Sequence, residues 1–234
     1  MKSRLIIIMC MVLAASPVFA GEKLELKTQK DKVSYAIGLD VGTGLKKNEV
    51  DVDPDIVARA IKDILAGNKP LMTEQEVKTT ITDLQKELQA KQQERMKTLG
   101  DKNKKEGEAF LAQNKTKDGV KTLPSGLQYK VITEGKGKFP KSSDTVTVQY
   151  KGTLIDGTEF DSSYKRGQAA TFPVGGVIKG WTEALQLMKE GSKWQLFIPS
   201  DLAYGVSGTQ GGPIGPNAVL IFEVELVSIK APEK

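Results

Sequence analysis

Apolar residues recur at helical spacing through the first half of the chain. Between residues 31 and 48 they stand at every fourth position: Val33, Ile37, Val41 and Leu45. This spacing predicts a helix with one apolar face. Gly38 and Gly42 lie inside it, and each would weaken an isolated helix by about 1 kcal/mol relative to alanine. We therefore expect a second helix, from this chain or another, to pack closely against the two glycines.

Another helix is predicted shortly afterwards. Asp53 can cap its first turn, and Pro54 takes the first helical position. A wide apolar face follows: Ile56, Val57, Ala60, Ile61, Ile64 and Leu65. Gly67 is a typical helix end.

A third helix is predicted to begin at Thr73, because Glu76 three residues later completes a capping box. Its apolar residues follow at spacings of 4, 3 and 4: Val77, Ile81, Leu84 and Leu88. Beyond them the stripe thins, so a helix that continued to about Ala112 would be a rod of about 60 Å that bridges two parts of the chain. Gly100 and Gly107 are also consistent with a break, and both possibilities stay open.

The helical part has little room for a core of its own. Because closed two-fold pairing is the commonest protein assembly, burial of the apolar faces against a second copy is expected. We predict a homodimer formed through the N-terminal helices. Residues 21–72 would be the helical dimerisation region, and residues 73–119 a long connecting helix and linker.

From Val120 onward the pattern changes to strands. Apolar residues take every second position in four segments: Leu127, Tyr129 and Val131; Val146, Val148 and Tyr150; Trp194, Leu196 and Ile198; and Leu220, Phe222, Val224 and Leu226. Turn signals lie between them: Asp156-Gly157, Lys189-Glu190-Gly191 and Gly211-Gly212-Pro213. Residues 120–234 are expected to form a twisted antiparallel sheet wrapped over one short helix, and the fold class is α+β.

The short helix is predicted around the stretch from Val177 to Trp181. Four side chains share one of its faces: Ile178, Trp181, Leu185 and Met188. Such a stripe is typical of a hydrophobic core, but a tryptophan at the start of a helix can also form the floor of an apolar pocket. The pattern alone leaves both interpretations open.

The first 20 residues are typical of a secretory signal peptide. Lys2 and Arg4 precede an apolar run over residues 5–15, which is too short to span a bilayer. We predict cleavage after Ala20. Cleavage would remove Cys10, the one cysteine of the chain, and the exported protein would have no transmembrane segment and no thiol chemistry.

Composition excludes several classes of function. The sequence has no histidine, which removes His-based catalytic triads and His metal sites. It has no phosphate-binding loop of the Gly-x-x-x-x-Gly-Lys-Ser/Thr type. Loss of Lys2 and Arg4 would reduce 34 basic residues to 32 against 29 acidic ones. Since the two signs are interleaved, as over residues 101–108, we expect solvated faces and no nucleic-acid partner.

Five separated motifs occur in a characteristic order: Tyr150-Lys151-Gly152, Asp156-Gly157-Thr158-Glu159-Phe160-Asp161-Ser162-Ser163, Val177-Ile178-Lys179-Gly180-Trp181, Asp201-Leu202-Ala203-Tyr204-Gly205 and Leu220-Ile221-Phe222. Over about residues 121–230 this order resembles the FKBP-type peptidyl-prolyl isomerases. Two N-terminal stretches are similar to the secreted, dimeric macrophage-infectivity-potentiator type of that family: Asp31-Lys32-Val33-Ser34-Tyr35 and Thr73-Glu74-Gln75-Glu76.

The resemblance implies a pocket for proline. Trp181 would form its floor, and its walls would be Tyr150, Phe160, Val177, Ile178, Ile214 and Phe222. The implied catalytic residues are Asp161, which orients the pocket, and Tyr204, which donates a hydrogen bond to a bound carbonyl; Arg166 would steady Asp161. Taken alone, Phe160 and Phe222 also fit a core, and residues 161–163 also fit a turn. No metal or other cofactor is implied.

The resemblance further implies a periplasmic enzyme, in solution or associated with the outer membrane or cell surface, that isomerises X-Pro bonds in exported polypeptides. Macrolide inhibitors would occupy the same pocket. The alternative is a dimeric chaperone or binding module whose turnover has no physiological role. Ala170 stands where some single-domain members carry a bulky aromatic residue, and residues 209–212 lack their histidine. These departures bear on ligand affinity and substrate preference.

Overall fold

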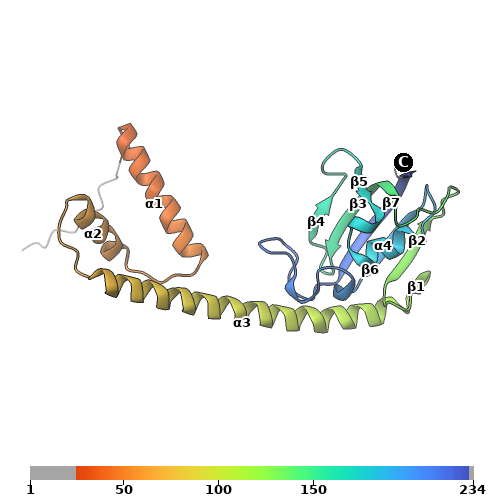
Figure 1. Cartoon of the computed structure of the whole chain (residues 1–234), viewed down its shortest axis with the longest axis horizontal. Coiled ribbons are helices and arrows are strands. Elements are labelled where there is room, and N and C mark those ends of the chain that lie inside the picture. Colours follow the sequence, from red (N-terminus) through yellow and green to blue (C-terminus); the bar gives the residue numbers. More distant parts are fainter. Residues whose placement is uncertain (1–24, 232–234) are drawn as a thin grey trace, which may run out of the picture. The chain divides into compact units, whose positions relative to one another are not determined.

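The computed structural model of the chain describes residues 25–231. The predicted signal peptide, residues 1–20 with Cys10, lies outside the described residues. The chain divides into two compact units, residues 1–76 and residues 77–234. The first is helical, whereas the second combines a long helix with an antiparallel sheet (Figure 1), which confirms the α+β class and the helical N-terminal region.

Two helices make up the described part of the first unit: α1 (Gln29–Lys47) and α2 (Pro54–Leu65). Each has a side-chain cap at its N-terminus. The hydroxyl of Thr28 accepts a hydrogen bond from the backbone N–H of Asp31 at 3.1 Å, and the carboxylate of Asp53 accepts one from that of Asp55 at 2.8 Å. Both predicted helices are therefore confirmed, with α1 beginning two residues earlier than expected because Thr28 is its cap.

The apolar faces of this unit remain exposed. No residue of α1 is buried, and the exposed side chains of the two helices include Val33, Tyr35, Ile37, Leu39, Val41, Ile56, Ile61, Ile64 and Leu65. Within residues 25–231, no atom lies within 4 Å of where a Cβ would stand at Gly38 or Gly42. Within the described part of the first unit, no other helix packs on these glycines.

Helix α3 (Glu74–Asn114) is one continuous helix of 41 residues. It begins with the predicted capping box, in which the Glu76 carboxylate accepts from the backbone N–H of Thr73 at 2.7 Å. Gly100 and Gly107 do not interrupt it. Both are buried, and Asn114, a further seven residues along, is buried as well. None of the helices within residues 25–231 is long and apolar enough to cross a membrane.

The glycines of α3 are points of close approach to the sheet domain. A Cβ at Gly107 would stand 2.7 Å from Cγ2 of Val219. At the end of the helix, the Asn114 amide donates to Oε1 of Gln128 at 3.0 Å, and the Gln128 amide donates to the carbonyl of Leu111 at 2.9 Å. The last turns of α3 are therefore packed and hydrogen-bonded as part of the second unit.

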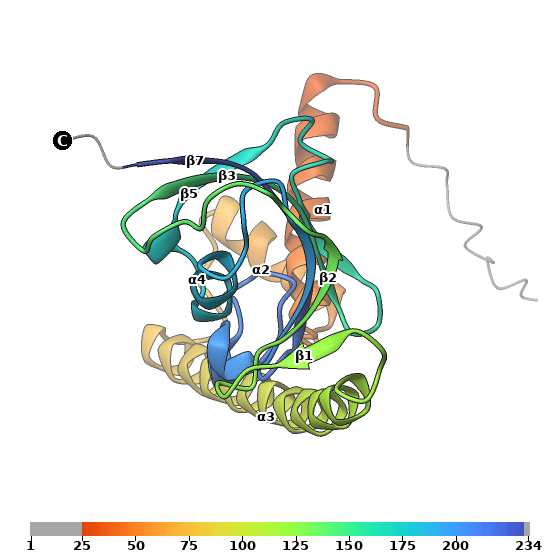
Figure 2. The ribbon, with the colours of Figure 1, turned by 90° about the vertical axis from the view of Figure 1, so that its right-hand side faces the viewer.

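The sheet has seven strands: β1 (Val120–Thr122), β2 (Gln128–Thr133), β3 (Thr145–Leu154), β4 (Glu159–Ser162), β5 (Ala170–Pro173), β6 (Lys193–Ile198) and β7 (Leu220–Lys230). Their order is β1-β2-β6-β7-β3-β4, and β5 also pairs with β3. All pairs are antiparallel. The sheet curves around the short helix α4 (Lys179–Leu185), as Figure 2 shows.

The hydrophobic core lies between the sheet and α4. From the strands it takes the side chains of alternating positions, including Val146, Val148, Tyr150, Trp194, Leu196, Ile198, Leu220, Phe222, Val224 and Leu226. From α4 and the turn after it come Trp181, Leu185 and Met188. Gly180 allows α4 to approach β6 closely, because a Cβ there would meet Cγ2 of Ile198 at 2.5 Å. The period-two pattern thus predicted the inward face of the sheet correctly.

We expect Gly107→Ala to destabilise the second unit. The added methyl group would meet Val219 at 2.7 Å, and overpacking costs about 1–3 kcal/mol, against a gain of about 1 kcal/mol in helix propensity. The difference is a net loss of about 0–2 kcal/mol, so the free energy of unfolding should fall by roughly 1 kcal/mol, measured by urea denaturation followed through tryptophan fluorescence. Glu108→Ala, at an exposed neighbouring position, is the control. An equally stable or more stable Gly107→Ala protein would show that the helix does not need this close approach.

Candidate active site

A cavity of about 680 Å³ opens between the start of α4, strands β3 and β4, and the loops that precede β7. Nine of the ten side chains singled out by the sequence line it: Tyr150, Phe160, Asp161, Val177, Ile178, Trp181, Tyr204, Ile214 and Phe222. The tenth, Arg166, does not line the cavity but hydrogen-bonds two residues that do. The structure therefore brings together residues that span more than sixty positions of the chain.

Trp181 lies where the cavity meets the core. Its side chain is only 4% exposed and meets three aromatic rings edge to face. The ring centroids of Tyr150 and Phe222 both lie 5.2 Å from that of Trp181, at interplanar angles of 90° and 80°, and the centroid of Phe172 lies 6.0 Å away at 89°. Trp181 belongs to the core cluster and lines the cavity as well. The position of Trp181 is thus compatible with both interpretations of the sequence pattern.

The aromatic wall leaves no room for a side chain at position 152 of β3, two residues after Tyr150. A Cβ at Gly152 would stand 2.7 Å from the ring of Phe160 and 2.7 Å from the ring of Phe222. These two rings meet edge to face, with centroids 5.4 Å apart. The missing side chain therefore leaves the space in which this aromatic wall forms.

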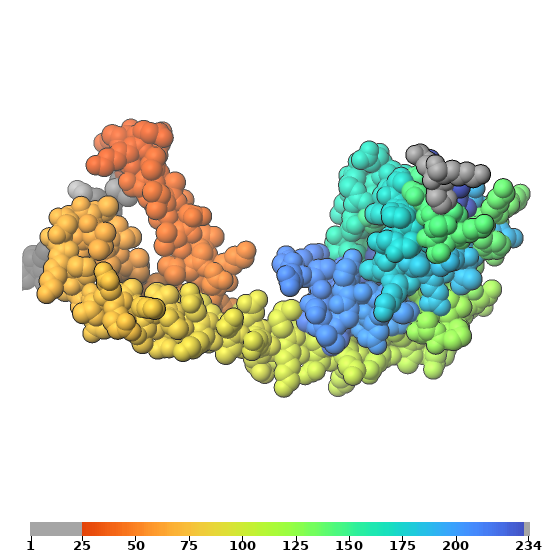
Figure 3. All heavy atoms as spheres, viewed as in Figure 1, coloured from red at the N-terminus to blue at the C-terminus, as the bar shows by residue number. Residues whose placement is uncertain are grey.

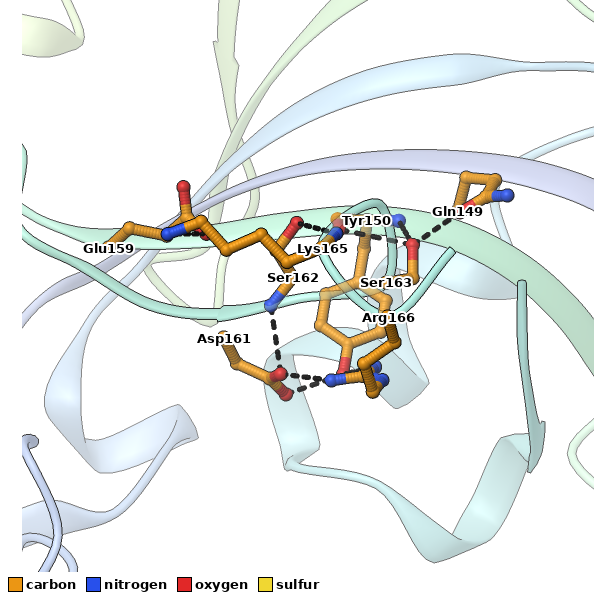
Figure 4. A network of polar contacts seen from close by, with 8 residues as sticks. All are labelled: Gln149, Tyr150, Glu159, Asp161, Ser162, Ser163, Lys165 and Arg166. Atoms are coloured by element: carbon orange, nitrogen blue, oxygen red, sulfur yellow. Dashed lines mark hydrogen bonds and ion pairs between the residues drawn. The ribbon is translucent and has the colours of Figure 1, made fainter. Parts of the chain in front are cut away.

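A polar network borders the apolar wall (Figure 4). The hydroxyl of Tyr150 donates to Oδ2 of Asp161 at 2.5 Å. The guanidinium of Arg166 donates to Oδ1 of Asp161 and, at 2.7 Å, to the Tyr150 hydroxyl. The backbone N–H of Ser162 also donates to Oδ1 of Asp161, at 2.8 Å. Three donors thus hold the carboxylate in place: Tyr150, Arg166 and the Ser162 backbone.

A second set of hydrogen bonds, drawn in the same view, holds the end of β4 against β3. The hydroxyl of Ser163 accepts from the backbone N–H of Tyr150 at 2.8 Å and donates to Oε1 of Gln149 at 2.5 Å. The backbone N–H of Ser163 donates to the carbonyl of Tyr150 at 3.0 Å. Asp161 and Ser162 are thus the last residues of β4, and the turn begins only at Ser163. The interpretation of residues 161–163 as a simple turn is wrong for the first two, because pairing of β4 with β3 places Asp161 at the cavity.

The network sets the protonation states at the rim. Burial raises the pKa of the Asp161 carboxyl, but hydrogen bonds from Tyr150 and Arg166 outweigh it, so the pKa lies below its ordinary value. Burial, followed by the hydrogen bond to Asp161, raises the pKa of Tyr150. Hydrogen bonds to Tyr150 and Asp161 raise the pKa of Arg166. Asp161 is therefore an ionised, paired carboxylate and Tyr150 a neutral phenol around neutral pH.

Tyr204 stands on the opposite rim, between the 3-10 turns η2 (Ser200–Leu202) and η3 (Gly205–Ser207). Its side chain is 42% exposed and lines the cavity. Among the residues that the structure describes, none forms a hydrogen bond with its hydroxyl. The hydroxyl is therefore available to donate to a bound molecule.

The sequence did not identify every residue of the cavity wall. The further lining residues are Phe172, Gly176, Ala203, Thr209, Gly212 and Pro213. Phe172 had a detectable signal, since it lies two positions after Ala170 on β5 and both face the same side of a strand. Phe172 supplies an aromatic ring to the cavity wall, whereas Ala170 has no ring to contribute. The others come from loops, whose path no periodic pattern reveals. No three His, Cys, Asp or Glu side chains group as metal ligands within residues 25–231.

Two family models match the chain. The model for FKBP-type peptidyl-prolyl cis-trans isomerases covers residues 136–227, and the model for the domain amino terminal to this isomerase covers residues 30–131. The chain is 49% identical to the outer membrane protein MIP of Legionella longbeachae, over 98% of this chain and 99% of that protein. It is 48% identical to the peptidyl-prolyl cis-trans isomerase Mip of Coxiella burnetii, over 88% and 89% of the two chains.

A solved structure shows the same fold. The crystal structure of FkpA from Escherichia coli matches with a TM-score of 0.69 at 39% sequence identity, covering 88% of this chain and 99% of that one. The similarity thus includes both the helical region and the sheet domain.

We expect Arg166→Ala to raise the pKa of Asp161. In the native protein, hydrogen bonds from Tyr150 and Arg166 lower this pKa, so the network stabilises the fold fully above the unfolded-state pKa and loses that contribution as pH falls through the lower folded-state value. Without Arg166 the two pKa values lie closer together, so the contribution should be smaller and its loss should be complete at a higher pH. A carbon NMR titration of the Asp161 carboxyl would measure the shift. Lys165→Ala, which removes a partner of Glu159 instead, is the control, and an unchanged Asp161 titration in Arg166→Ala would contradict the assignment.

Proposed function

The chain belongs to the FKBP-type peptidyl-prolyl cis-trans isomerases, and from this premise we propose that it isomerises X-Pro bonds of exported polypeptides, without covalent chemistry, in the aromatic cavity above Trp181. The observation that carries the proposal is the cavity itself: an apolar wall of aromatic rings next to one fixed carboxylate and one free tyrosine hydroxyl. The family resemblance read from the five motifs is confirmed by the comparisons.

The reaction needs no nucleophile, acid or base. Rotation about the X-Pro bond crosses a barrier of about 18–20 kcal/mol because the twisted amide loses its resonance. The planar amide is the more polar and better hydrated form, so an apolar cavity disfavours it more than the twisted form. The Trp181 floor and the Phe160 and Phe222 wall supply such surroundings.

Binding of the proline ring alone does not accelerate rotation. Burial contributes about 0.8 kcal/mol for each CH₂ group, but the planar and twisted forms gain it equally, and only a difference between them changes the rate. We assign that difference to Tyr204. Its free hydroxyl would hold one substrate carbonyl while the chain on the other side of the bond turns.

Asp161 acts on the pocket rather than on the substrate bond. Its two oxygens are occupied by Tyr150, Arg166 and the Ser162 backbone, and the X-Pro bond has no proton to remove. The carboxylate therefore orients the Tyr150 ring that lies against Trp181. A macrolide inhibitor, if it binds, would occupy the same cavity.

We further propose that the protein is a homodimer. The apolar faces of α1 and α2 are exposed in one chain, and the space beside Gly38 and Gly42 is open, as close packing of a second copy requires. The proposed division is a signal peptide over residues 1–20, a dimerisation region over 21–72, a connecting helix and linker over 73–119, and the isomerase domain over 120–234. Two isomerase domains in one dimer would bind a long substrate with avidity.

The proposed location follows from the first 20 residues. A signal peptide of the predicted type would direct the chain to the periplasm, in solution or at the outer membrane or cell surface. One relative is named an outer membrane protein. A dimeric chaperone or binding module whose turnover has no physiological role is the alternative.

We expect Asp161→Ala and Tyr204→Phe to lower the isomerisation rate without unfolding the domain. For Tyr204→Phe, loss of one hydrogen bond made to the twisted form should reduce kcat roughly five- to tenfold. A protease-coupled assay on a short X-Pro peptide measures the rate, and circular dichroism verifies the fold. Tyr164→Phe, a tyrosine outside the cavity, is the matched control. Folded variants with full activity would disprove these roles, and a native protein without peptide turnover would favour the binding module.

Sedimentation velocity at micromolar concentration should show a dimer. Gly38→Arg should convert it to a monomer, since the long side chain would fill the space that a second helix needs. Asp40→Arg places the same side chain about 200° further around the helix and should leave the dimer intact. A native protein that sediments as a monomer would remove the dimer from the proposed function.

A further inference from the structure

One loop joins the cavity to the long helix. The wall loop, residues 205–219, runs from η3 to β7 and contributes Thr209, Gly212, Pro213 and Ile214 to the lining of the cavity. Further along, its residues 215–219 lie against α3. Figure 1 and Figure 3 show this blue segment resting on the yellow-green part of α3. The same loop therefore touches both the proposed substrate site and the helix.

Two asparagine side chains make reciprocal hydrogen bonds between helix and loop. On the helix, the Asn103 amide donates to the carbonyl of Pro216 at 2.8 Å. On the loop, the Asn217 amide donates to the carbonyl of Gly100 at 3.1 Å. Gly100 and Asn103 are one helical turn apart, so the two bonds hold adjacent points of the loop to one side of α3.

Helix and loop pack tightly at two glycines. A Cβ at Gly100 would stand 3.2 Å from Cβ of Pro216, and a Cβ at Gly215 would stand 3.0 Å from Cδ2 of Leu99. Asn217 has a φ of 55°, a conformation that asparagine tolerates better than most residues. Glycines on both sides thus allow helix and loop to approach closely, and Asn217 adopts the left-handed backbone conformation in the loop.

The contact is coupled to the cavity through short steps along the loop. Ile214, which is 5% exposed and lines the cavity, precedes Pro216 by two residues. Its carbonyl accepts from the backbone N–H of Thr209 at 2.8 Å, which closes the tip of the loop. The backbone N–H of Asn217 donates to the carbonyl of Gly205 at 2.8 Å, which closes its base. Pro216 and Asn217 therefore lie two and three residues from a side chain that lines the cavity, in a loop closed at both ends by hydrogen bonds.

We propose that Asn103 and Asn217 are positioning residues for the isomerase, and that α3 is part of the cavity's support as well as a connector. This inference rests on the proposed function, which places the substrate in this cavity. Without the two amide bonds the wall loop samples more conformations, and the substrate must order it on binding. That cost falls on the planar and twisted forms alike, so it raises KM and leaves kcat nearly unchanged.

The test uses the full chain with Asn103→Ala, with Asn217→Gly and with both changes. Glycine accepts the positive φ of position 217, so only the amide bond is lost, and alanine preserves the helix at position 103. Lys104→Ala, at an exposed position of the same turn, is the control. In the protease-coupled peptide assay we expect KM to rise roughly three- to tenfold in the variants. Hydrogen exchange at the backbone N–H groups of Thr209 and Asn217 should become faster.

Other outcomes separate the two proposals. Unchanged KM and exchange in the folded double variant overturn the positioning role, as does a loss confined to kcat. If Asn217→Gly unfolds the chain, Asn103→Ala alone decides the question, because it leaves the loop backbone unaltered. Full activity in Asp161→Ala and Tyr204→Phe would instead overturn the site itself, while faster exchange in the loop would still show that the asparagines hold it.

Discussion

The edge-to-face packing of Tyr150, Phe172 and Phe222 on Trp181 links the core of the sheet domain to its cavity. Each such pair contributes about 0.5–1.5 kcal/mol beyond simple burial, and the three together restrict the orientation of the indole. The indole also lines the cavity. The contacts that hold α4 against the sheet therefore also fix part of the cavity wall.

The polar side of the site complements this apolar floor. A carboxylate beside aromatic rings would be costly if it were unpaired, and Asp161 avoids that cost through its donors Tyr150, Arg166 and Ser162. The carboxylate thereby holds the Tyr150 ring in place through the hydrogen bond that it accepts from the Tyr150 hydroxyl. Tyr204, which has no such partner among the described residues, remains as the donor that a substrate carbonyl can meet. Asp161 is thus occupied by hydrogen bonds within the protein, whereas the Tyr204 hydroxyl is available to a ligand. This difference supports their separate roles in the proposed mechanism.

Helix α3 carries two kinds of surface along its length. Its first turns continue the exposed apolar stripe, with Val77 and Ile81 about half exposed. This exposure is consistent with the proposed dimer. Its last turns present Gly100, Gly107 and Asn114 to the sheet domain. The last turns of the helix are therefore a structural part of the second unit.

The sequence by itself determined the elements of this protein, because helix caps such as Asp53 and Thr73 and the alternation of each strand depend on residues that are near neighbours in the chain. The ordered motifs also identified most of the cavity, including Trp181. The tertiary structure alone decided the continuity of α3. Locally, Gly100 and Gly107 cost about 1 kcal/mol each and suggest a break. Contacts with a loop more than a hundred residues away favour glycine at both positions, because close approach depends on two segments that only folding brings together.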